Sequence, residues 1–312
     1  MRSKKVLLSA FKVVISVALI AFLLHRIGIN VLAKTLSNAN ITYITLAFAL
    51  IVSGVVISSY KWHILLSVHD IKMDLSTLVS LYFISMFWRN FLSTVGGEAY
   101  KIYGVSKQTG KLIESFASVV LERGTGLLAL LSISFVSVLF GHGFGLDKTV
   151  ILLVIILFVG YLLIVGTLFN RNWSMRIIKI FAFFKSDALL AKITKVHNSI
   201  FMYRGHKALL IRAVIISFIY QTTAVVMAVF IISRSLNLQI PLIYFFLFCP
   251  IIGIFEMLPI SLNGIGVREG AFLFFFTKVG VLEVQAFSMS FVMYAVVLIV
   301  SLIGGVVYAV KR

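Results

Sequence analysis

Long apolar stretches separated by short polar segments make up nearly the whole chain. A helix needs about 20 mostly apolar residues to cross the hydrocarbon core of a bilayer. Helices are the expected spanning elements, because the bilayer core offers no water to satisfy free backbone groups. The pattern therefore predicts six full transmembrane helices, at Val6–Leu24, Ile41–Leu66, Leu112–Phe140, Thr149–Phe169, Ala208–Ile232 and Val284–Val310.

Two further apolar stretches are interrupted by polar residues, glycine or proline. Leu75–Val95 contains Arg89-Asn90 and ends at Gly96-Gly97. Pro241–Phe276 contains a larger set of expected breaks, at Pro250, Pro259, Ser261, Asn263, Gly264 and Gly266. We expect each stretch to form a broken, re-entrant helical hairpin, the first over Leu75–Gly97, with the two entering from opposite faces of the membrane. Eight simple spans are the alternative.

The composition supports an all-α polytopic membrane protein. The 312 residues are 61% hydrophobic and 12% charged, with a mean hydropathy of +1.10, whereas soluble domains are about a quarter charged. Little sequence remains for a separate soluble domain, so we expect one transmembrane domain over residues 1–312. The N-terminal apolar run lacks a small-x-small cleavage site and is interpreted as a retained span.

Basic residues dominate the charge, with 28 Lys and Arg against 10 Asp and Glu and a net charge of +18. Most of them lie in loops, which is typical of cytoplasmic loops beside anionic headgroups and argues against a nucleic-acid partner. The segment 170–212 holds one acid, Asp187, and nine basic residues, Arg171, Arg176, Lys179, Lys185, Lys192, Lys195, Arg204, Lys207 and Arg212. We therefore expect the cell membrane, with this loop and both termini on the cytoplasmic side.

The same basic loop, 170–207, has an amphipathic pattern. Its aromatic and aliphatic residues recur at helical spacing between basic ones, at Trp173, Ile177, Ile180, Phe181 and Phe184. This spacing predicts a helix that lies in the membrane interface with its apolar face in the acyl boundary. A plain positive-inside anchor and a lipid-selecting surface both fit the pattern.

The two interrupted stretches resemble each other weakly. Leu92–Gly96 and Ile260–Gly264 both read apolar-Ser-x-x-Gly, and each precedes a glutamate, Glu98 or Glu269. Paired, interrupted hydrophobic segments in two halves of a chain are a pointer to the central site of a transporter. The two stretches are therefore candidates for an inverted repeat.

Charged residues inside the apolar segments are candidates for function. A charge at the centre of a spanning helix costs about 2.5–3.5 kcal/mol, and a leucine offsets only about 0.3–0.6 kcal/mol. Such residues should face one another or a wet cavity. They are Arg89, Glu98, Glu122, Arg123, Glu256, Arg268 and Glu269.

Arginine is suited to a phosphate because its planar fork donates two parallel hydrogen bonds. We expect a phosphate or headgroup cradle from Arg89, Lys101, Arg123 and Arg268, helped by free N–H groups at helix N-termini near the glycines. The sequence neighbours Glu122-Arg123 and Arg268-Glu269 point in different directions on a helix, so each residue is expected to pair across helices. The alternative is that these ion pairs only hold the bundle together.

Other chemistry is not indicated. The six histidines are scattered without metal-ligand spacing, Cys249 is the only cysteine, and there is no Walker A sequence. We therefore expect no metal, no cofactor and no catalytic residues, and a protein that is not an enzyme.

Three motifs carry a resemblance to a known family. They are Leu258–Gly270, with its Pro-x-Ser-x-x-Gly-x-Gly-x-Arg-Glu pattern; Phe91–Tyr103, around Gly96-Gly97-Glu98; and Glu122-Arg123 followed by Gly126. In this order they resemble the lysylphosphatidylglycerol synthetase transmembrane-region family, often called flippase-like. The resemblance implies a module that moves a phospholipid or lipid-linked glycan between leaflets. Its candidate headgroup-binding residues are Arg89, Glu98, Lys101, Glu122, Arg123, Asn263, Arg268 and Glu269.

Two departures limit what this resemblance carries over. Ser93-Thr94 and Glu98 stand where the first motif usually has a proline and an aspartate, and Lys101 replaces an arginine. The chain stops at Arg312, where full-length synthetases bear an aminoacyl-transferase domain, so we expect no synthase activity. A separately encoded lipid-modifying enzyme or glycosyltransferase is an expected partner, beside anionic or glycosylated membrane lipids.

Two other functions stay open at this point. An ion-coupled secondary transporter of a small solute would use Glu98 or Glu269 as its proton-coupling carboxylate. A non-transporting membrane subunit would anchor a lipid-modifying enzyme through the basic loop.

Overall fold

The computed structural model describes residues 29–140, 148–172, 176, 187–257, 261 and 263–311. The predicted first span Val6–Leu24, the predicted break at Pro259 and the apolar positions of the predicted amphipathic helix lie outside these residues.

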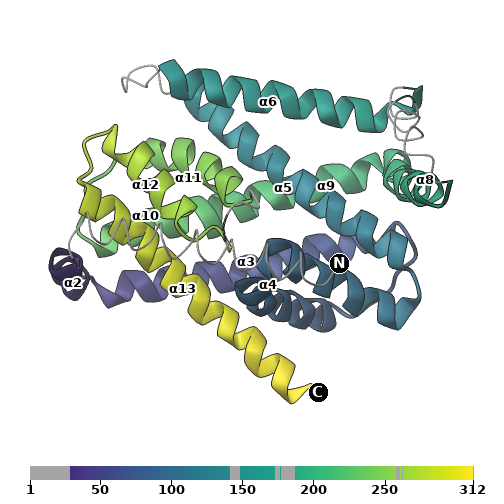
Figure 1. Ribbon diagram of the computed structural model, residues 1–312, viewed down its shortest axis with the longest axis horizontal. Coiled ribbons are helices and arrows are strands. Elements are labelled where there is room, and N and C mark those ends of the chain that lie inside the picture. Colours follow the sequence, from purple (N-terminus) through teal and green to yellow (C-terminus); the bar gives the residue numbers. More distant parts are fainter. Residues whose placement is uncertain are drawn as a thin grey trace.

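The described chain is helical throughout and contains no strand. Its elements, shown in Figure 1, are α2 (Ile29–Ser37), α3 (Ile41–Ser67), α4 (Leu75–Thr109), α5 (Leu112–Phe140), α6 (Lys148–Phe169), α8 (Asp187–Met202), η3 (Tyr203–Gly205), α9 (Lys207–Tyr220), η4 (Gln221–Met227), α10 (Ala228–Ser235), α11 (Leu242–Met257), α12 (Val267–Thr277) and α13 (Glu283–Val310).

Five helices of the described chain are long and apolar enough to cross a membrane: α3, α5, α6, the continuous unit Lys207–Ser235, and α13. They correspond to five of the six predicted full spans. The unit Lys207–Ser235 joins α9 and α10 through η4, a π-helical segment. A π turn widens a helix by one residue per turn and is common at functional sites.

The first interrupted stretch doubles back on itself. The Ser85 hydroxyl donates to the Gly97 carbonyl at 2.8 Å, although 12 residues of straight helix would span about 18 Å. Gly104 lies against Leu81 in the same way. The chain turns between Asn90 and Val95, and the expected break at Gly96-Gly97 is wrong because the returning arm continues through these glycines to Thr109.

Gly97 has a packing role in this hairpin rather than a breaking one. A Cβ atom at Gly97 would lie 2.6 Å from the Ser85 carbonyl oxygen, which is closer than non-bonded atoms allow. The absence of a side chain lets the two arms of α4 touch.

The second interrupted stretch forms α11 and α12, which run antiparallel. Phe248 of α11 stacks against Phe275 of α12, and Gly264 returns beside the Glu256 side chain near the end of α11. Pro250 does not break the chain as expected, because α11 continues through it. A proline removes one backbone hydrogen bond, and neighbouring helices of a membrane bundle tolerate that loss. The change of direction follows Met257 instead.

The ends of the helices gather at two poles of the molecule. At one pole, the Tyr203 hydroxyl donates to the carbonyl of Leu65 near the end of α3, and Lys111 donates to the His69 carbonyl. At the other, the Asn40 N–H donates to the Ser235 carbonyl at the end of α10. α4 starts from the first pole and α11 from the second, so the two hairpins approach each other from opposite poles (Figure 1).

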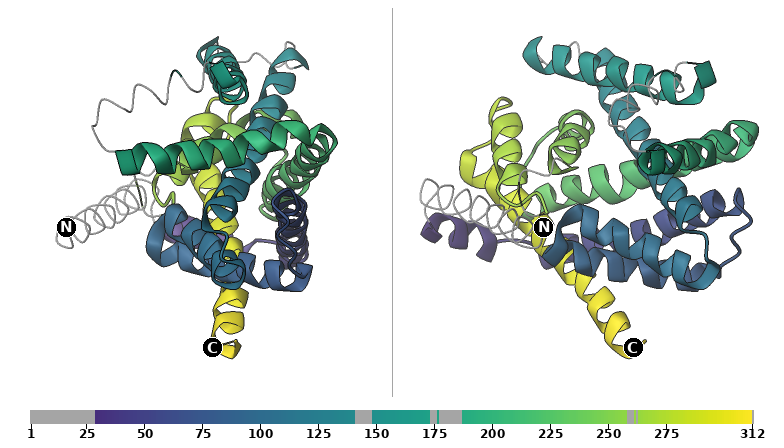
Figure 2. Two further views of the ribbon diagram at one scale, coloured as in Figure 1. Left: turned by 90° about the vertical axis from the view of Figure 1, so that its right-hand side faces the viewer. Right: turned by 45° about the vertical axis from the view of Figure 1, so that its right-hand side comes forward.

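The core is aliphatic and aromatic, and α13 crosses it. Buried residues of α3, α10, α11, α12 and α13 form the main cluster. Gly304 of α13 packs directly on the Phe83 backbone of α4, and the C-terminal end of α13 extends beyond the other helices (Figure 2). This crossing fixes the first hairpin against the last span.

α6 lies at the edge of the molecule (Figure 1). Only Val150 and Val154 are buried in it, and apolar side chains such as Leu163 and Ile164 are exposed. An exposed apolar helix is expected where lipid replaces water as the surrounding medium.

Candidate functional site

A cavity of about 230 Å³ lies where the two hairpins meet. Six of the eight predicted site residues line it: Arg89, Glu98, Glu122, Arg123, Asn263 and Arg268. The other two, Lys101 and Glu269, stand directly behind lining residues to which they are bonded. Side chains that were 180 positions apart in the sequence are thus brought to one site.

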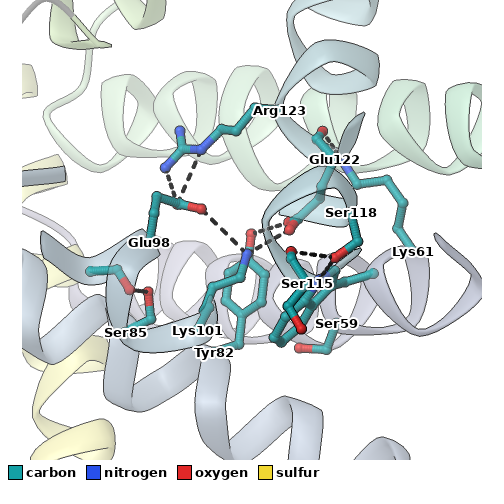
Figure 3. A network of polar contacts seen from close by, with 12 residues as sticks. Ser59, Lys61, Tyr82, Ser85, Glu98, Lys101, Ser115, Ser118, Glu122 and Arg123 are labelled. Atoms are coloured by element: carbon teal, nitrogen blue, oxygen red, sulfur yellow. Dashed lines mark hydrogen bonds and ion pairs between the residues drawn. The ribbon is translucent and has the colours of Figure 1, made fainter. Parts of the chain in front are cut away.

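Lys101 of α4 is enclosed by two acids and two aromatic rings, and Figure 3 shows it beside Glu98, Glu122 and Tyr82. Its Nζ lies 2.5 Å from Glu122 Oε2 and 3.7 Å from Glu98 Oε2. The rings of Tyr82 and Trp62 have their centroids 4.2 Å and 4.7 Å from the same nitrogen. Lys101 is 1% exposed, so its charge is used inside the protein and is not presented to the cavity.

Glu98 and Arg123 form the second pair of this cluster, joining the returning arm of α4 to α5 (Figure 3). The Arg123 guanidinium donates to Glu98 Oε1 through both Nε and Nη2. Glu122 also accepts from the Tyr82 hydroxyl at 3.0 Å. The expectation that Glu122 and Arg123 each pair across helices is confirmed.

Arg268 and Glu269 bond to each other as well as across helices, since both contact Ser290 of α13 and Arg268 also lies near Glu256 of α11. Both lie in the first turn of α12, where Glu269 Oε2 turns back to accept the Gly266 N–H at 2.6 Å. Ser290 of α13 completes the group, since it accepts from Arg268 Nε at 3.1 Å and donates to Glu269. The Gly266 N–H, expected to be free for an anion, is occupied by this carboxylate.

Glu256 is the most loosely held acid at the cavity. Its side chain is 38% exposed, and its Oε1 lies 3.9 Å from Arg268 Nε. Glu269, by contrast, is 3% exposed at its side chain. Arg268 therefore lies closer to Glu269 than to Glu256, and much of the Glu256 side chain stays open to the cavity.

Asn263 connects the two hairpins. Its amide donates to Asn90 Oδ1 at 3.0 Å, and the Asn90 amide donates to Ser301 of α13 at 2.7 Å. Asn263 has a φ of 52°, in the left-handed region that asparagine tolerates better than most residues. The sequence motif thus places an amide at the tip of the second hairpin, within reach of the first.

The comparisons with known proteins agree with this architecture. The family model described as the lysylphosphatidylglycerol synthase TM region matches residues 9–305. The chain belongs to this family.

Two curated relatives of this synthase TM family member are UPF0104 membrane proteins. One, from Methanocaldococcus jannaschii, is 29% identical over 38% of this chain and 36% of its own length. The other, from Pyrococcus horikoshii, is 29% identical over 36% of this chain and 34% of its own length. The chain thus matches about a third of the length of each relative. No solved structure matches it significantly.

As a member of the synthase TM family, the chain is a multi-pass membrane protein. Two of the residues that depart from the first family motif, Glu98 and Lys101, have partners in the structure. Glu98 and Lys101 both bond to α5. In the described part of the chain, no three His, Cys, Asp or Glu side chains are grouped to hold a metal ion.

Lys61 is a site residue that sequence reasoning missed. It lies in α3, is 3% exposed and lines the cavity. Its Nζ donates to the Glu122 carbonyl at 3.1 Å and to the Ser217 hydroxyl at 3.0 Å. The signal was present, because a lysine within the apolar stretch Ile41–Leu66 carries the same insertion cost as the charges that were singled out.

Proposed function

We propose that the protein is a lipid translocase, with a polar headgroup passing through the cavity while the acyl chains stay in the surrounding lipid. The observation that carries this proposal is the cavity itself. Charged side chains from both hairpins line it, inside a bundle whose outer helices expose apolar residues. A charged group passing from one leaflet to the other needs such a lining, because an unpaired charge in hydrocarbon is costly.

The proposal includes two re-entrant hairpins related as an inverted repeat. Its support is that α4 and α11–α12 come from opposite poles and that Asn90 and Asn263 bond where they meet. The cavity is then reached by one hairpin from each membrane face, as alternating access at a central site requires.

The orientation and partners belong to the same proposal. The pole with Lys111 and Arg204 would face the cytoplasm, where basic loops meet anionic headgroups. We propose that the cargo is an anionic or glycosylated lipid, and that the protein moves it without a catalytic step. A separately encoded enzyme would then make the lipid.

Reconstitution into vesicles tests the proposal. Vesicles carrying a fluorescent phosphatidylglycerol in both leaflets are treated with dithionite, which bleaches only the outer leaflet. A translocase lets bleaching proceed beyond about half of the signal at a rate proportional to protein content, and Arg268→Ala slows it. Bleaching that stops at half, with phosphatidylglycerol and with a lipid-linked glycan alike, would contradict the proposal.

Glu256 favours a second candidate, an ion-coupled transporter of a small solute. Glu98 and Glu269, the carboxylates first expected to couple protons, form close ion pairs with arginines. The Glu256 side chain is 38% exposed and lies 3.9 Å from Arg268. This reading predicts uptake of a water-soluble solute that is driven by a pH gradient and lost in Glu256→Gln. Lipid movement that is unaffected by a pH gradient would favour the translocase.

A further inference from the structure

The charges at the cavity do not cancel. The described residues that line it or stand directly behind the lining supply five cations, Lys61, Arg89, Lys101, Arg123 and Arg268. They also supply four carboxylates, Glu98, Glu122, Glu256 and Glu269. Counted as formal charges, five against four leaves one positive charge in excess.

Three of the cations are already neutralised within the protein. Lys101 is paired with Glu122, Arg123 with Glu98, and Arg268 with Glu269. Each of these contacts is a charge-assisted hydrogen bond, the strong kind. The positive charge of each of the three is therefore already compensated by a carboxylate of the protein.

Arg89 has no such partner. Among the described residues it makes no hydrogen bond and no ion pair within 4.0 Å, and its Nε is buried without an acceptor. An arginine always carries its charge and presents a planar fork of donors. Arg89 therefore offers the cavity an uncompensated guanidinium.

Lys61 is the second cation without a carboxylate. Its two acceptors within the described chain are neutral, a carbonyl and a hydroxyl, which leaves its charge uncompensated. It comes from α3, whereas Arg89 comes from α4, so the two charges reach the cavity from different walls.

We propose that Arg89 and Lys61 are the anion-binding pair of this cavity, and that they bind a phosphate diester with a single negative charge. Arg89 would hold two of the phosphate oxygens through its fork, and Lys61 would act as a point charge. The ion-paired Arg123 and Arg268 would hold the walls in place. The inference rests on the proposed translocation for its lipid source, but the binding of the anion stands apart from movement.

The charge count selects the class of ligand. One negative charge brings the cavity to neutrality, and a phosphate diester carries one. A diphosphate brings two or more and would leave a negative excess in a site with little water, which is unfavourable. The cavity is therefore better matched to a phospholipid headgroup than to a lipid diphosphate.

Binding measurements on the full chain in detergent micelles test this pair. The probes are phosphatidylglycerol, followed by native mass spectrometry, and glycerophosphoglycerol, its soluble headgroup, followed by calorimetry. We expect Arg89→Gln to weaken binding at least tenfold and Lys61→Gln about fivefold. The matched control is Arg234→Gln, an arginine whose partners are Leu238 and Gln239, and it should bind like wild type.

The two probes separate the sources of the diester. If the variants lose binding of phosphatidylglycerol alone, the site is assigned to a lipid headgroup. If they lose binding of both probes, the site is assigned to the diester itself. Either outcome supports the pair. Wild-type affinity in both Arg89→Gln and Lys61→Gln would overturn it, and so would an equal loss in Arg234→Gln.

A variant that should raise the affinity, instead of lowering it, tests the proposal even if Arg89→Gln does not fold. Glu256→Gln removes a loosely held negative charge, so phosphatidylglycerol affinity should rise at least threefold. The double variant Arg89→Gln/Glu256→Gln should bind more tightly than Arg89→Gln alone. Unchanged or weaker binding in Glu256→Gln would refute the charge balance.

The dithionite assay distinguishes this inference from the proposed function. If wild type binds the diester through Arg89 but moves no lipid, translocation fails and the anion pair stands. If Arg89→Gln moves and binds phosphatidylglycerol like wild type, the anion pair fails and translocation stands.

Discussion

Lys101 illustrates how a buried charge is made tolerable in this bundle. It has two carboxylates and two aromatic faces around one ammonium. Breaking a buried pair on one side is destabilising because the remaining charge is left without compensation. The contribution of Lys101 is therefore to the stability of the contact between α4 and α5.

Replacing Lys101 tests that role. Lys101→Met should lower the free energy of unfolding by about 3–5 kcal/mol, because Glu122 would stay buried without its cation. Thermal unfolding of the purified protein in detergent measures the effect. Lys107→Met, an exposed lysine on the same helix, is the control and should unfold near the wild-type temperature. Equal stability of the two variants would contradict the structural role.

His69 gives a pH dependence outside the spans. It is 6% exposed, its ring lies edge-on to Tyr203, and its Nε2 has no partner in the described chain. Burial lowers the pKa of His69 from its usual value, because the charged ring is poorly solvated there.

The sign of the effect follows from which state takes up the proton first. The unfolded chain protonates this histidine near pH 6.5, and the folded chain does so only at lower pH. The free energy of unfolding should thus fall as the pH drops below about 6.5. Thermal midpoints of wild type and His69→Gln between pH 7.5 and 5 check this, since the variant should lose less stability. Parallel curves would exclude His69 as the cause.

Residue by residue, the sequence located the charges but not their partners. Insertion cost singled out Glu98, Glu122 and Arg123; Glu98 pairs with Arg123, and Glu122 pairs with Lys101. It could not foresee that Arg268 bonds to its own neighbour, because that contact depends on Glu269 turning back to Gly266 in three dimensions.

At the level of elements, hydropathy predicted the spans well. A long apolar run satisfies all its backbone groups in a bilayer by forming a helix. The predicted span Leu112–Phe140 accordingly coincides with α5. The positions where helices end or turn were harder to predict, because glycine and proline occur at close helix contacts and within membrane helices as well as at turns. Pro250 lies within a continuous helix, and Gly97 marks a close contact beyond the turn.

Gly97 gives a prediction at this scale. Gly97→Ala places a Cβ 2.6 Å from the Ser85 carbonyl oxygen, so the arms of α4 must move apart. Overpacking of this kind costs about 1–3 kcal/mol, and thermal unfolding should register it. Gly160→Ala, where no atom lies within 4 Å of the added Cβ, should cost nothing. Equal stability of Gly97→Ala and wild type would show that the arms adjust freely.

For the molecule as a whole, the proposed orientation can be tested at exposed residues of the two poles. One pole, near Tyr203 and His69, contains the basic residues Lys72, Lys111 and Arg204. Gln239 lies in the segment that follows α10 at the other pole. The proposed orientation places the pole with Lys72, Lys111 and Arg204 on the cytoplasmic side.

Cysteine labelling checks this orientation. In a Cys249→Ala background, a membrane-impermeant maleimide should label Gln239→Cys in intact cells and Lys72→Cys only in inside-out vesicles. Both positions are exposed, so absence of label reports the side of the membrane. The reverse pattern would place the basic pole outside.

The bond between the hairpin tips has a consequence for motion. Asn90, Asn263 and Ser301 are linked by two neutral hydrogen bonds, each of which contributes about 1 kcal/mol net. The ion pairs around the cavity are stronger and hold α4 to α5. The polar contact between the hairpin tips is therefore weaker than the ion pairs, and its strength should not depend on ionic strength or on pH, because amides and hydroxyls carry no charge near neutral pH. Of the polar contacts described at the site, this one should cost least to break, and breaking it would leave the ion pairs of Lys101, Arg123 and Arg268 intact.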